Sequence, residues 1–168
     1  MAIRDIVIYP DPRLREDSVV VEDPTSIKAL VDDMAETMYA ESGAGLAAIQ
    51  VGVPKRVFII DAPIAGGSEQ DPPIVFINPE VVKLGQELES SEEGCLSFPD
   101  IYVPIKRSLR ATFGASDLSG QRFEMEGEGL LARAMQHEFD HLNGKLIADF
   151  VGRIKRQLIQ RKLARSQD

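Results

Sequence analysis

Three residues account for all of the histidine and cysteine in this 168-residue chain, and their positions constrain what it can fold into. His137 and His141 are four residues apart, so on an α-helix both side chains lie on one face and can reach one ion. Cys95, the only thiol, lies 42 residues upstream of His137, next to Gly94. This pattern predicts one divalent-metal site, and therefore a fold that brings the cysteine to the histidine helix.

Glu138 completes the pattern His-Glu-x-x-His. It projects about 100° around the helix from His137, since one turn takes about 3.6 residues, so it can border an ion without binding it. In metallohydrolases such a glutamate is the general base beside the metal. The motif is short, and two unrelated surface histidines on an amphipathic helix are the alternative interpretation.

The source of the third ligand separates the possible metal chemistries. Zinc peptidases usually take it from a downstream His or Glu, but the chain after His141 contains no His, Cys or Glu. A Cys95 thiolate would complete a Cys-His-His set and leave the fourth tetrahedral position for water, as in catalytic sites. The alternative is a small buried hydrophobe, the usual state of a free cysteine. The neighbouring Gly94 and Ser97-Phe98-Pro99 favour a turn-bounded edge over a core strand.

A segment of small residues follows a predicted helix: Gly43-Ala44-Gly45-Leu46-Ala47-Ala48-Ile49-Gln50. Its glycines and alanines leave a backbone that a ligand can approach closely, and Gln50 offers an amide donor and acceptor. The segment predicts the wall of a cleft. The alternative is that Gly43 caps the preceding helix and a plain connector follows, which leaves Gln50 unexplained.

In three ordered blocks the chain resembles the peptide deformylases. The blocks are Gly43 to Gln50, Glu93-Gly94-Cys95-Leu96-Ser97 and Gln136-His137-Glu138-Phe139-Asp140-His141. The opening Tyr9-Pro10-Asp11-Pro12-Arg13-Leu14-Arg15 also fits, so the resemblance covers nearly the whole chain. It implies a metal-dependent hydrolase that removes the formyl group from the N-terminal formyl-methionine of nascent polypeptides and releases formate.

The resemblance also implies roles for single residues. Those matching Cys95, His137 and His141 bind the metal, that matching Glu138 is the general acid/base, and those matching Gln50 and the Leu96 backbone N–H steady the carbonyl oxygen. A Cys-His-His set suits Fe²⁺ or Zn²⁺ by ligand type. The resemblance implies Fe²⁺ in the cell, with Zn²⁺ or Ni²⁺ expected in a purified sample.

The substrate is expected to bind in two ways. The peptide would lie extended along Gly43, Ala44 and Gly45 as an added strand, which makes binding tolerant of sequence. Leu130 and Ala134 share a helical face with the histidines and are candidates for the methionine pocket. Apolar residues on a buried helix are more often plain core, so this alternative stays open.

Periodicity predicts an α+β fold. One apolar stripe predicts a helix over 26–42, and a second helix, carrying the metal ligands, is predicted from about Gly129 to Asn143. Short β-branched runs predict strands at 56–61 and 74–78, and alternation predicts a hairpin over 109–125. Strands without βαβ alternation indicate small antiparallel or mixed sheets packed around the metal-binding helix, with a further helix at the C-terminal end.

Composition bounds this interpretation. The chain is 43% hydrophobic and 27% charged, with no linker or repeat, so residues 1–168 are expected to form one catalytic domain. No apolar run approaches the length of a membrane span, and one cysteine cannot form an internal disulfide. We expect a reduced, cytoplasmic protein that contacts neither membrane nor DNA.

The basic charge is concentrated at the C-terminal end. Residues 152–168 carry a formal charge of +5 within a chain of −8. Ile154, Leu158, Ile159 and Leu163 predict an amphipathic helix from about Arg153 to Arg165, with Lys155, Arg156, Arg161, Lys162 and Arg165 on its outer face. Such a helix could bind RNA electrostatically, and the resemblance suggests contact with the ribosome near its exit tunnel. A solvated helix face is the alternative.

Two residues depart from the deformylase pattern, and two other functions are alternatives to deformylation. Tyr102 stands where many bacterial deformylases carry a basic residue, and Phe98 where an aliphatic residue is common. A general zinc peptidase is disfavoured by the missing downstream ligand. A non-catalytic, ribosome-associated module with a structural metal is disfavoured because it gives no reason for Glu138 and Gln50.

Overall fold

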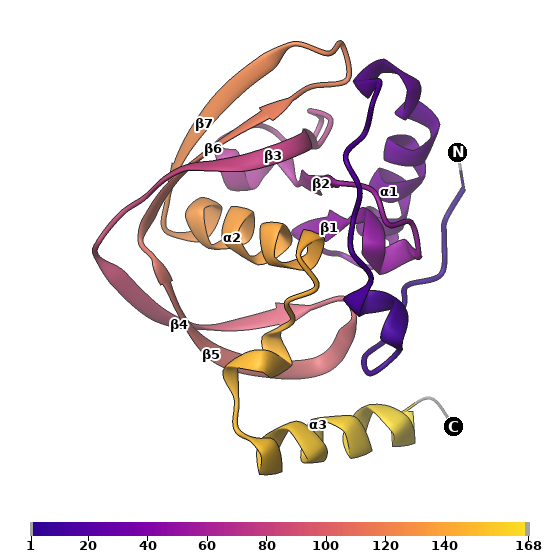
Figure 1. Cartoon of the computed structure of the whole chain (residues 1–168), viewed down its shortest axis with the longest axis vertical. Coiled ribbons are helices and arrows are strands. Elements are labelled where there is room, and N and C mark those ends of the chain that lie inside the picture. Colours follow the sequence, from indigo (N-terminus) through magenta and orange to yellow (C-terminus); the bar gives the residue numbers. More distant parts are fainter. Residues whose placement is uncertain (1, 167–168) are drawn as a thin grey trace.

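A computed structural model describes residues 2–166 of the chain (Figure 1). The helices are α1 (Lys28–Ala40), α2 (Leu130–Leu142) and α3 (Arg153–Ser166). The strands are β1 (Gly45–Ala47), β2 (Val57–Ile60), β3 (Ile74–Leu84), β4 (Leu88–Cys95), β5 (Phe98–Ser108), β6 (Arg110–Ser116) and β7 (Arg122–Glu128). Short 3₁₀ helices occupy Pro12–Arg15, Pro24–Ser26, Ala48–Val51, Ala62–Ala65 and Ile147–Phe150.

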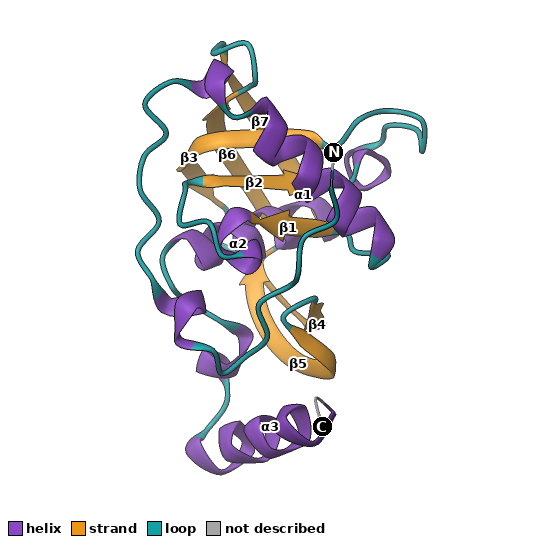
Figure 2. Ribbon diagram, turned by 90° about the vertical axis from the view of Figure 1, so that its right-hand side faces the viewer, coloured by secondary structure: helices purple, strands orange, loops and turns teal. Residues whose placement is uncertain are grey.

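The named strands form two separate sheets. Five of them pair antiparallel in the order β1-β2-β3-β6-β7, so β1 is an edge strand. The other two, β4 and β5, pair only with each other and form a two-stranded arm. Figure 1 and Figure 2 show α2 between the five-stranded sheet and this arm, with α3 beyond the arm. The predicted α+β architecture around a central helix is confirmed.

Helix α2 is buried because its apolar residues face the five-stranded sheet. The core there joins side chains of α2 to aromatic side chains of the sheet: Ala132, Met135, Leu142, Phe58, Phe76 and Phe113. Gly127 allows β7 to approach the helix, since a Cβ at this position would lie 2.7 Å from Leu131 Cγ. At the other end Gly144 takes a φ of 71°, which favours glycine and follows the end of the helix.

The helices and the hairpin lie where periodicity predicted them, within a few residues at each end. The strand predicted at 74–78 is longer, because β3 continues to Leu84. Strands β1, β4 and β5 were not predicted. Most side chains of β4 are polar and exposed, so its sequence has no apolar alternation, and it is a strand because β5 pairs with it along its length.

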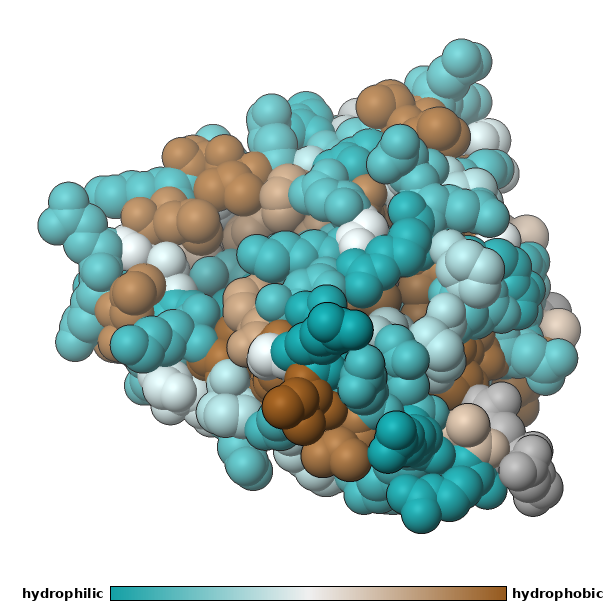
Figure 3. Space-filling model, turned by 60° about the horizontal axis from the view of Figure 1, so that its bottom comes forward, coloured by the Kyte–Doolittle hydropathy of each residue, from teal (hydrophilic) through white to brown (hydrophobic). Residues whose placement is uncertain are grey.

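The prediction of which α3 side chains are buried and which are exposed is only partly right. Ile159 and Leu163 are buried against the arm and the N-terminal segment, but Ile154 and Leu158 are 78% and 55% exposed. Arg156 was expected on the outer face, yet its guanidinium donates to the backbone oxygens of Ala148 and Val151. Figure 3, which brings this end of the molecule forward, shows apolar surface beside strongly hydrophilic side chains. Within residues 2–166, none of the helices has the length and apolar character needed to cross a bilayer.

Candidate metal centre

The structure brings Cys95, His137 and His141 together. Cys95 ends β4 at the tip of the arm, and the two histidines lie one turn apart on the adjacent face of α2. Their ligand atoms all lie within 4.8 Å of one another. The Nε2 of His141 is 3.4 Å from Cys95 Sγ and 3.3 Å from His137 Nε2. Among the described residues, these three form the group that could hold a metal ion.

The spacing of these donor atoms fits one shared ion. Metal bonds of about 2.3 Å to sulfur and 2.0–2.1 Å to nitrogen, at tetrahedral angles, place the donors roughly 3.3–3.6 Å apart. The two distances to His141 match this separation. A thiolate and two imidazoles are also a chemically suitable set for Fe²⁺, Zn²⁺ or Ni²⁺. The residues therefore fit a divalent metal by both geometry and ligand type.

Glu138 lies next to this group without belonging to it. Its Oε2 is 3.9 Å from His137 Nε2, and its Oε1 is buried with no hydrogen-bond partner among the described residues. Gly45 makes room for it, because a Cβ there would lie 2.9 Å from Oε2. Burial raises the pKa of Glu138 to about 7, before the charge of any bound cation is added. This carboxyl can exchange a proton near neutral pH.

A buried ionic network orients His137 from behind. The Nδ1 of His137 is 2.8 Å from Glu93 Oε1, which directs the other ring nitrogen toward Cys95 and His141. Arg107 donates to both oxygens of Glu93 at 2.8 and 2.9 Å, and Arg133 donates to one of them at 2.7 Å. Burial by itself would raise the pKa of Glu93, but the hydrogen bonds from Arg107 and His137 outweigh it and hold the pKa at about 2. Glu93 is therefore a carboxylate that can support a metal-binding imidazole.

Gln50 is buried between the small-residue segment and the tip of the arm. Its Oε1 accepts from the Ala47 backbone N–H at 3.0 Å, which fixes the orientation of the amide. Its Nε2 donates to Ser97 Oγ at 3.1 Å and lies 3.4 Å from Cys95 Sγ. The amide group thus faces the candidate ligands, as the prediction of a polar side chain in a cleft wall requires.

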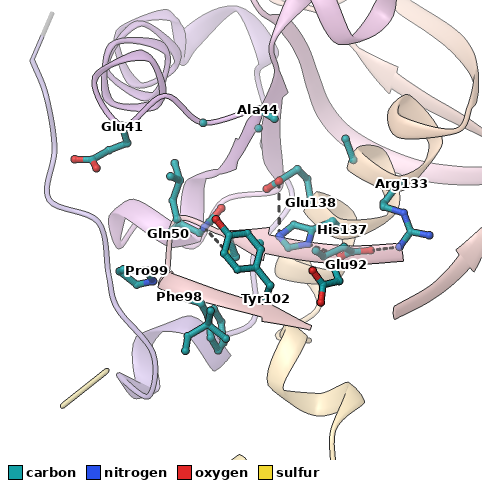
Figure 4. Close-up of a pocket in the computed structure, with 18 of the residues that line it drawn as sticks. Glu41, Ala44, Gln50, Glu92, Phe98, Pro99, Tyr102, Arg133, His137 and Glu138 are labelled. Atoms are coloured by element: carbon teal, nitrogen blue, oxygen red, sulfur yellow. Dashed lines mark hydrogen bonds and ion pairs between the residues drawn. The ribbon is translucent and has the colours of Figure 1, made fainter. Parts of the chain in front are cut away.

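A cleft of about 480 Å³ opens beside Cys95, His137 and Glu138 (Figure 4). This volume suits a small molecule or the end of a peptide. The cleft is lined by the remaining residues assigned to substrate or oxyanion binding from the sequence: Gly43, Ala44, Gly45, Leu96, Leu130 and Ala134. A Cβ on Gly43 would lie 2.7 Å from Leu96 Cδ1, so the glycine leaves room for a side chain of the site itself.

The two unusual residues of the arm have different places. The Tyr102 ring packs over Gly94 and is 63% exposed at the mouth of the cleft, in front of Gln50 and His137 in Figure 4. Phe98 is buried and stacks on Tyr9 with ring centroids 4.6 Å apart. Tyr102 can therefore touch a ligand, whereas Phe98 borders the cleft but is buried in the core beneath the arm.

The supporting charges were missed by the sequence analysis. Glu93, Arg107, Arg133 and Asp140 were not assigned roles, because charged residues are usually solvated. One signal was present for Arg133, which precedes His137 by four residues and so lies on the ligand-bearing face of the helix. The partners of Arg133 lie on β4 and β5, and this pairing depends on an arm that the sequence did not predict.

Cys95, His137 and His141 place one sulfur and two nitrogen donors around one point, and the ionisable carboxyl of Glu138 lies next to them at the wall of a cleft. This arrangement is typical of metal-dependent hydrolases. Comparison with known sequences narrows this class. Residues 3–157 match the family described as polypeptide deformylase, and the chain belongs to that family. It is accordingly a hydrolase, and family membership supports removal of an N-formyl group from new peptides.

Relatives and solved structures agree over nearly the whole length. Peptide deformylases of Rhizobium meliloti and Azotobacter vinelandii are 46% and 48% identical to this chain, covering 99% and 97% of it and 95% of each relative. A crystal structure of a peptide deformylase from Legionella pneumophila has a TM-score of 0.91 at 44% identity, covering 99% of this chain and 96% of that one. A peptide deformylase from Ehrlichia chaffeensis in complex with actinonin has a TM-score of 0.91 at 40% identity, covering 99% and 98%.

Proposed function

We propose that this chain removes the formyl group from the N-terminal formyl-methionine of nascent polypeptides, releasing formate, as one catalytic domain that depends on a divalent metal. The observation that carries the proposal is the buried Glu138 carboxyl beside the group formed by Cys95, His137 and His141, at the wall of a cleft. Membership of the polypeptide deformylase family supports the same reaction.

Cys95, His137 and His141 would hold the metal. A divalent ion at this position supplies a Lewis acid that polarises the formyl carbonyl and acidifies water. We propose Fe²⁺ as the ion in the cell, and Zn²⁺ or Ni²⁺ as replacements in purified protein. Glu93 keeps the His137 ring in the orientation that binding needs, through the 2.8 Å contact at Nδ1.

Glu138 is proposed as the proton carrier of the reaction. It accepts a proton from the attacking water and delivers it to the departing α-amine, so that one carboxyl serves both halves of the reaction. Burial raises the pKa of Glu138 and a bound cation would lower it again, and these opposing effects suit a carboxyl that has to take and give a proton in one reaction. The unpartnered Oε1 leaves one oxygen of the carboxyl available for these contacts.

Gln50 and Leu96 are proposed as donors to the carbonyl oxygen, which gains negative charge during attack. The Gln50 amide is already oriented by Ala47 and lies beside Cys95. Leu96 lies in the turn between β4 and β5, directly after the cysteine. Preorganised donors of this kind each lower the barrier by about 3–4 kcal/mol in other oxyanion holes.

The peptide is proposed to bind along the edge of the five-stranded sheet. Gly43, Ala44 and Gly45 lead into β1, which is an edge strand and so can accept an extended chain. Leu130 and Ala134, one helical turn apart on α2, would contact the methionine side chain. Backbone pairing of this kind tolerates many sequences, which an enzyme acting on most new chains requires.

Formate release from a formyl-methionyl peptide tests the proposal. The protein is prepared anaerobically, its metal content is measured on the same sample, and a formylated peptide is compared with an unformylated peptide of the same sequence. We expect stoichiometric formate, one metal ion per chain and an intact peptide backbone. Cleavage of internal peptide bonds without formate release would favour the general peptidase and contradict the proposal.

A second proposal concerns the ribosome. The outer face of α3 combines exposed Ile154 and Leu158 with exposed basic residues, a composition suited to a negatively charged RNA surface. Replacing Lys155 and Arg161 by glutamate should weaken co-sedimentation with ribosomes at low salt. The same charge change at the exposed Lys83 and Lys106, outside α3, is the matched control. Equal binding by both double variants would contradict this docking site.

A further inference from the structure

The ligands of the candidate metal centre come from two elements that must be held at a fixed distance from each other. Two of its ligands lie on α2, which is packed against the five-stranded sheet, but Cys95 lies at the tip of the two-stranded β4–β5 arm. The arm joins the sheet only at its base, near Gly85 and Leu109, and the hairpin closes at Cys95 opposite Phe98. Two-stranded ribbons are marginally stable alone, and β5 is supported by a buried core shared with the N-terminal segment, the 3₁₀ helix Ile147–Phe150 and α3. That core includes no side chain of α2, so the distance between the arm and α2 depends on further contacts.

The tolerance for movement of the arm is small. From Leu88 to Cys95 the strand extends for about 23 Å, so a rotation of about 3° at the base would move the tip by about 1 Å. Metal–ligand distances are fixed within about 0.2 Å. Even a small displacement of the arm relative to α2 would therefore leave Cys95 at the wrong distance from the histidines.

Arg133 joins the helix to both strands of the arm. From α2 its Nη2 donates to the Glu89 backbone oxygen on β4 at 2.6 Å, and its Nη1 donates to the Ile105 backbone oxygen on β5 at 2.8 Å. Nη1 also donates to Glu93 Oε2 at 2.7 Å. The side chain is only 9% exposed, so these charge-assisted hydrogen bonds are shielded from water.

The planar shape of the guanidinium suits this task. Its N–H groups form a rigid fork, so four acceptors on two strands, including the Ser91 backbone oxygen at 3.5 Å, fix both the distance and the angle between arm and helix. Arg107 makes a second connection, because it donates to Glu93 and to Asp140 of α2. Arg107 is itself part of β5, however, and does not bond the β4 backbone in the way that Arg133 does.

We propose that Arg133 is a positioning residue that holds the β4–β5 arm, and with it the Cys95 thiolate, at the distance from α2 that a shared metal ion requires. This inference rests on the proposed function, since it assigns Cys95, His137 and His141 to one ion. Arg133 is not one of the proposed ligands, and it acts through the backbone of the arm and through Glu93.

The test is the rate of zinc release from loaded, full-length protein to an excess of a colorimetric chelator. Arg133→Met removes the fork but leaves Glu93 paired with Arg107 and His137, so no carboxylate is left without a partner. We expect release about tenfold faster or more, in line with the effect of losing a residue that supports metal ligands. Arg133→Lys can remake some of the contacts and should lie between Met and wild type, and it carries the test if the Met variant does not fold.

Two controls separate positioning from general destabilisation. Arg122→Met removes an exposed arginine that pairs with Glu80 on the five-stranded sheet. Met34→Ala opens a cavity in the fully buried core beneath α1 and lowers stability without removing any hydrogen bond between the arm and α2. Both should release zinc at the wild-type rate at a temperature well below unfolding.

Each possible result either supports or overturns the proposed role of Arg133. Fast release in Arg133→Met, partial recovery in Arg133→Lys and wild-type rates in both controls would support the inference. Unchanged release from Arg133→Met, or equally fast release from Met34→Ala, would overturn it while leaving the metal site intact. Failure of the wild-type chain to bind one zinc ion would overturn the proposed metal site, and this inference with it.

Discussion

Replacing Glu138 by glutamine should make the stability of the metal-free protein depend less on pH. It should also abolish most of the activity of the metal-loaded protein. Burial raises the pKa of Glu138 from 4.5 to about 7 in the folded chain. Between these pH values the folded state holds a proton that the unfolded state has released, so this group makes the protein less stable as pH rises. From pH 5 to pH 8 the lost stability is about 2–3 kcal/mol, at about 1.36 kcal/mol for each pKa unit.

Glutamine has nearly the same shape and cannot ionise, so the variant escapes this cost. Urea unfolding in chelator gives the free energy of unfolding of both proteins at pH 5 and pH 8. The change between these pH values is compared between wild type and variant, so any pH-independent effect of the amide on stability cancels. Formate release with metal restored should fall by about 10²- to 10⁴-fold, because a general acid/base has been lost. Equal pH dependence in the two proteins would contradict the raised pKa of Glu138, and activity within tenfold of wild type would contradict its role as proton carrier.

Three further changes have defined outcomes. Gly45→Ala places a Cβ 2.9 Å from Glu138 Oε2, which displaces the carboxyl, and should lower kcat roughly 10- to 100-fold at unchanged metal content. The control is Gly152→Ala, which has open space around the new Cβ and should match wild type in the same assay. Arg15→Ala removes a partly exposed bidentate pair with Asp149 and should cost below about 1 kcal/mol in urea unfolding at pH 7. Burial would raise the pKa of Asp149, but the Arg15 hydrogen bonds outweigh it and lower the pKa, so the part of this difference that comes from the ion pair should shrink as the pH falls below 3.8; a difference that does not shrink would contradict the pairing. Stripping the metal should abolish formate release, and one equivalent of added Fe²⁺ should restore it under anaerobic conditions; activity that survives complete removal would exclude the proposed chemistry.

Local periodicity predicted the helices because their apolar residues recur on one face. In α2, Ala132 and Met135 face the sheet, and this stripe is visible without knowledge of the tertiary fold. The scarcity of His and Cys predicted the meeting of Cys95 with His137 and His141, although the chain has to fold back over 42 residues to achieve it. These predictions needed only residue type and spacing.

The arm could not be predicted in the same way. Within β4 the one fully buried residue is the charged Glu93, so hydropathy places this segment at the surface. It is a strand because β5 pairs with it and because Arg107 and Arg133 neutralise the buried carboxylate. Buried ion pairs reverse the usual relation between charge and exposure, and their partners lie 14 and 40 residues away in sequence. A single sequence does not show which charges will meet.

The glycines show a related difference between pattern and structure. Gly43 and Gly45 were interpreted as backbone that a ligand can approach, but in the structure they also make room for the Leu96 and Glu138 side chains. Sequence identified where small residues matter, and only the folded chain shows what fills the space.

X-ray absorption at the metal edge of the zinc-loaded chain shows whether Cys95, His137 and His141 share one ion. We expect one sulfur scatterer at about 2.3 Å and two imidazole nitrogens at about 2.0–2.1 Å, with a light-atom scatterer as the fourth neighbour. The sulfur signal should disappear in Cys95→Ser. A spectrum without sulfur, or one that is the same in wild type and Cys95→Ser, would show that Cys95 does not share the ion with His137 and His141.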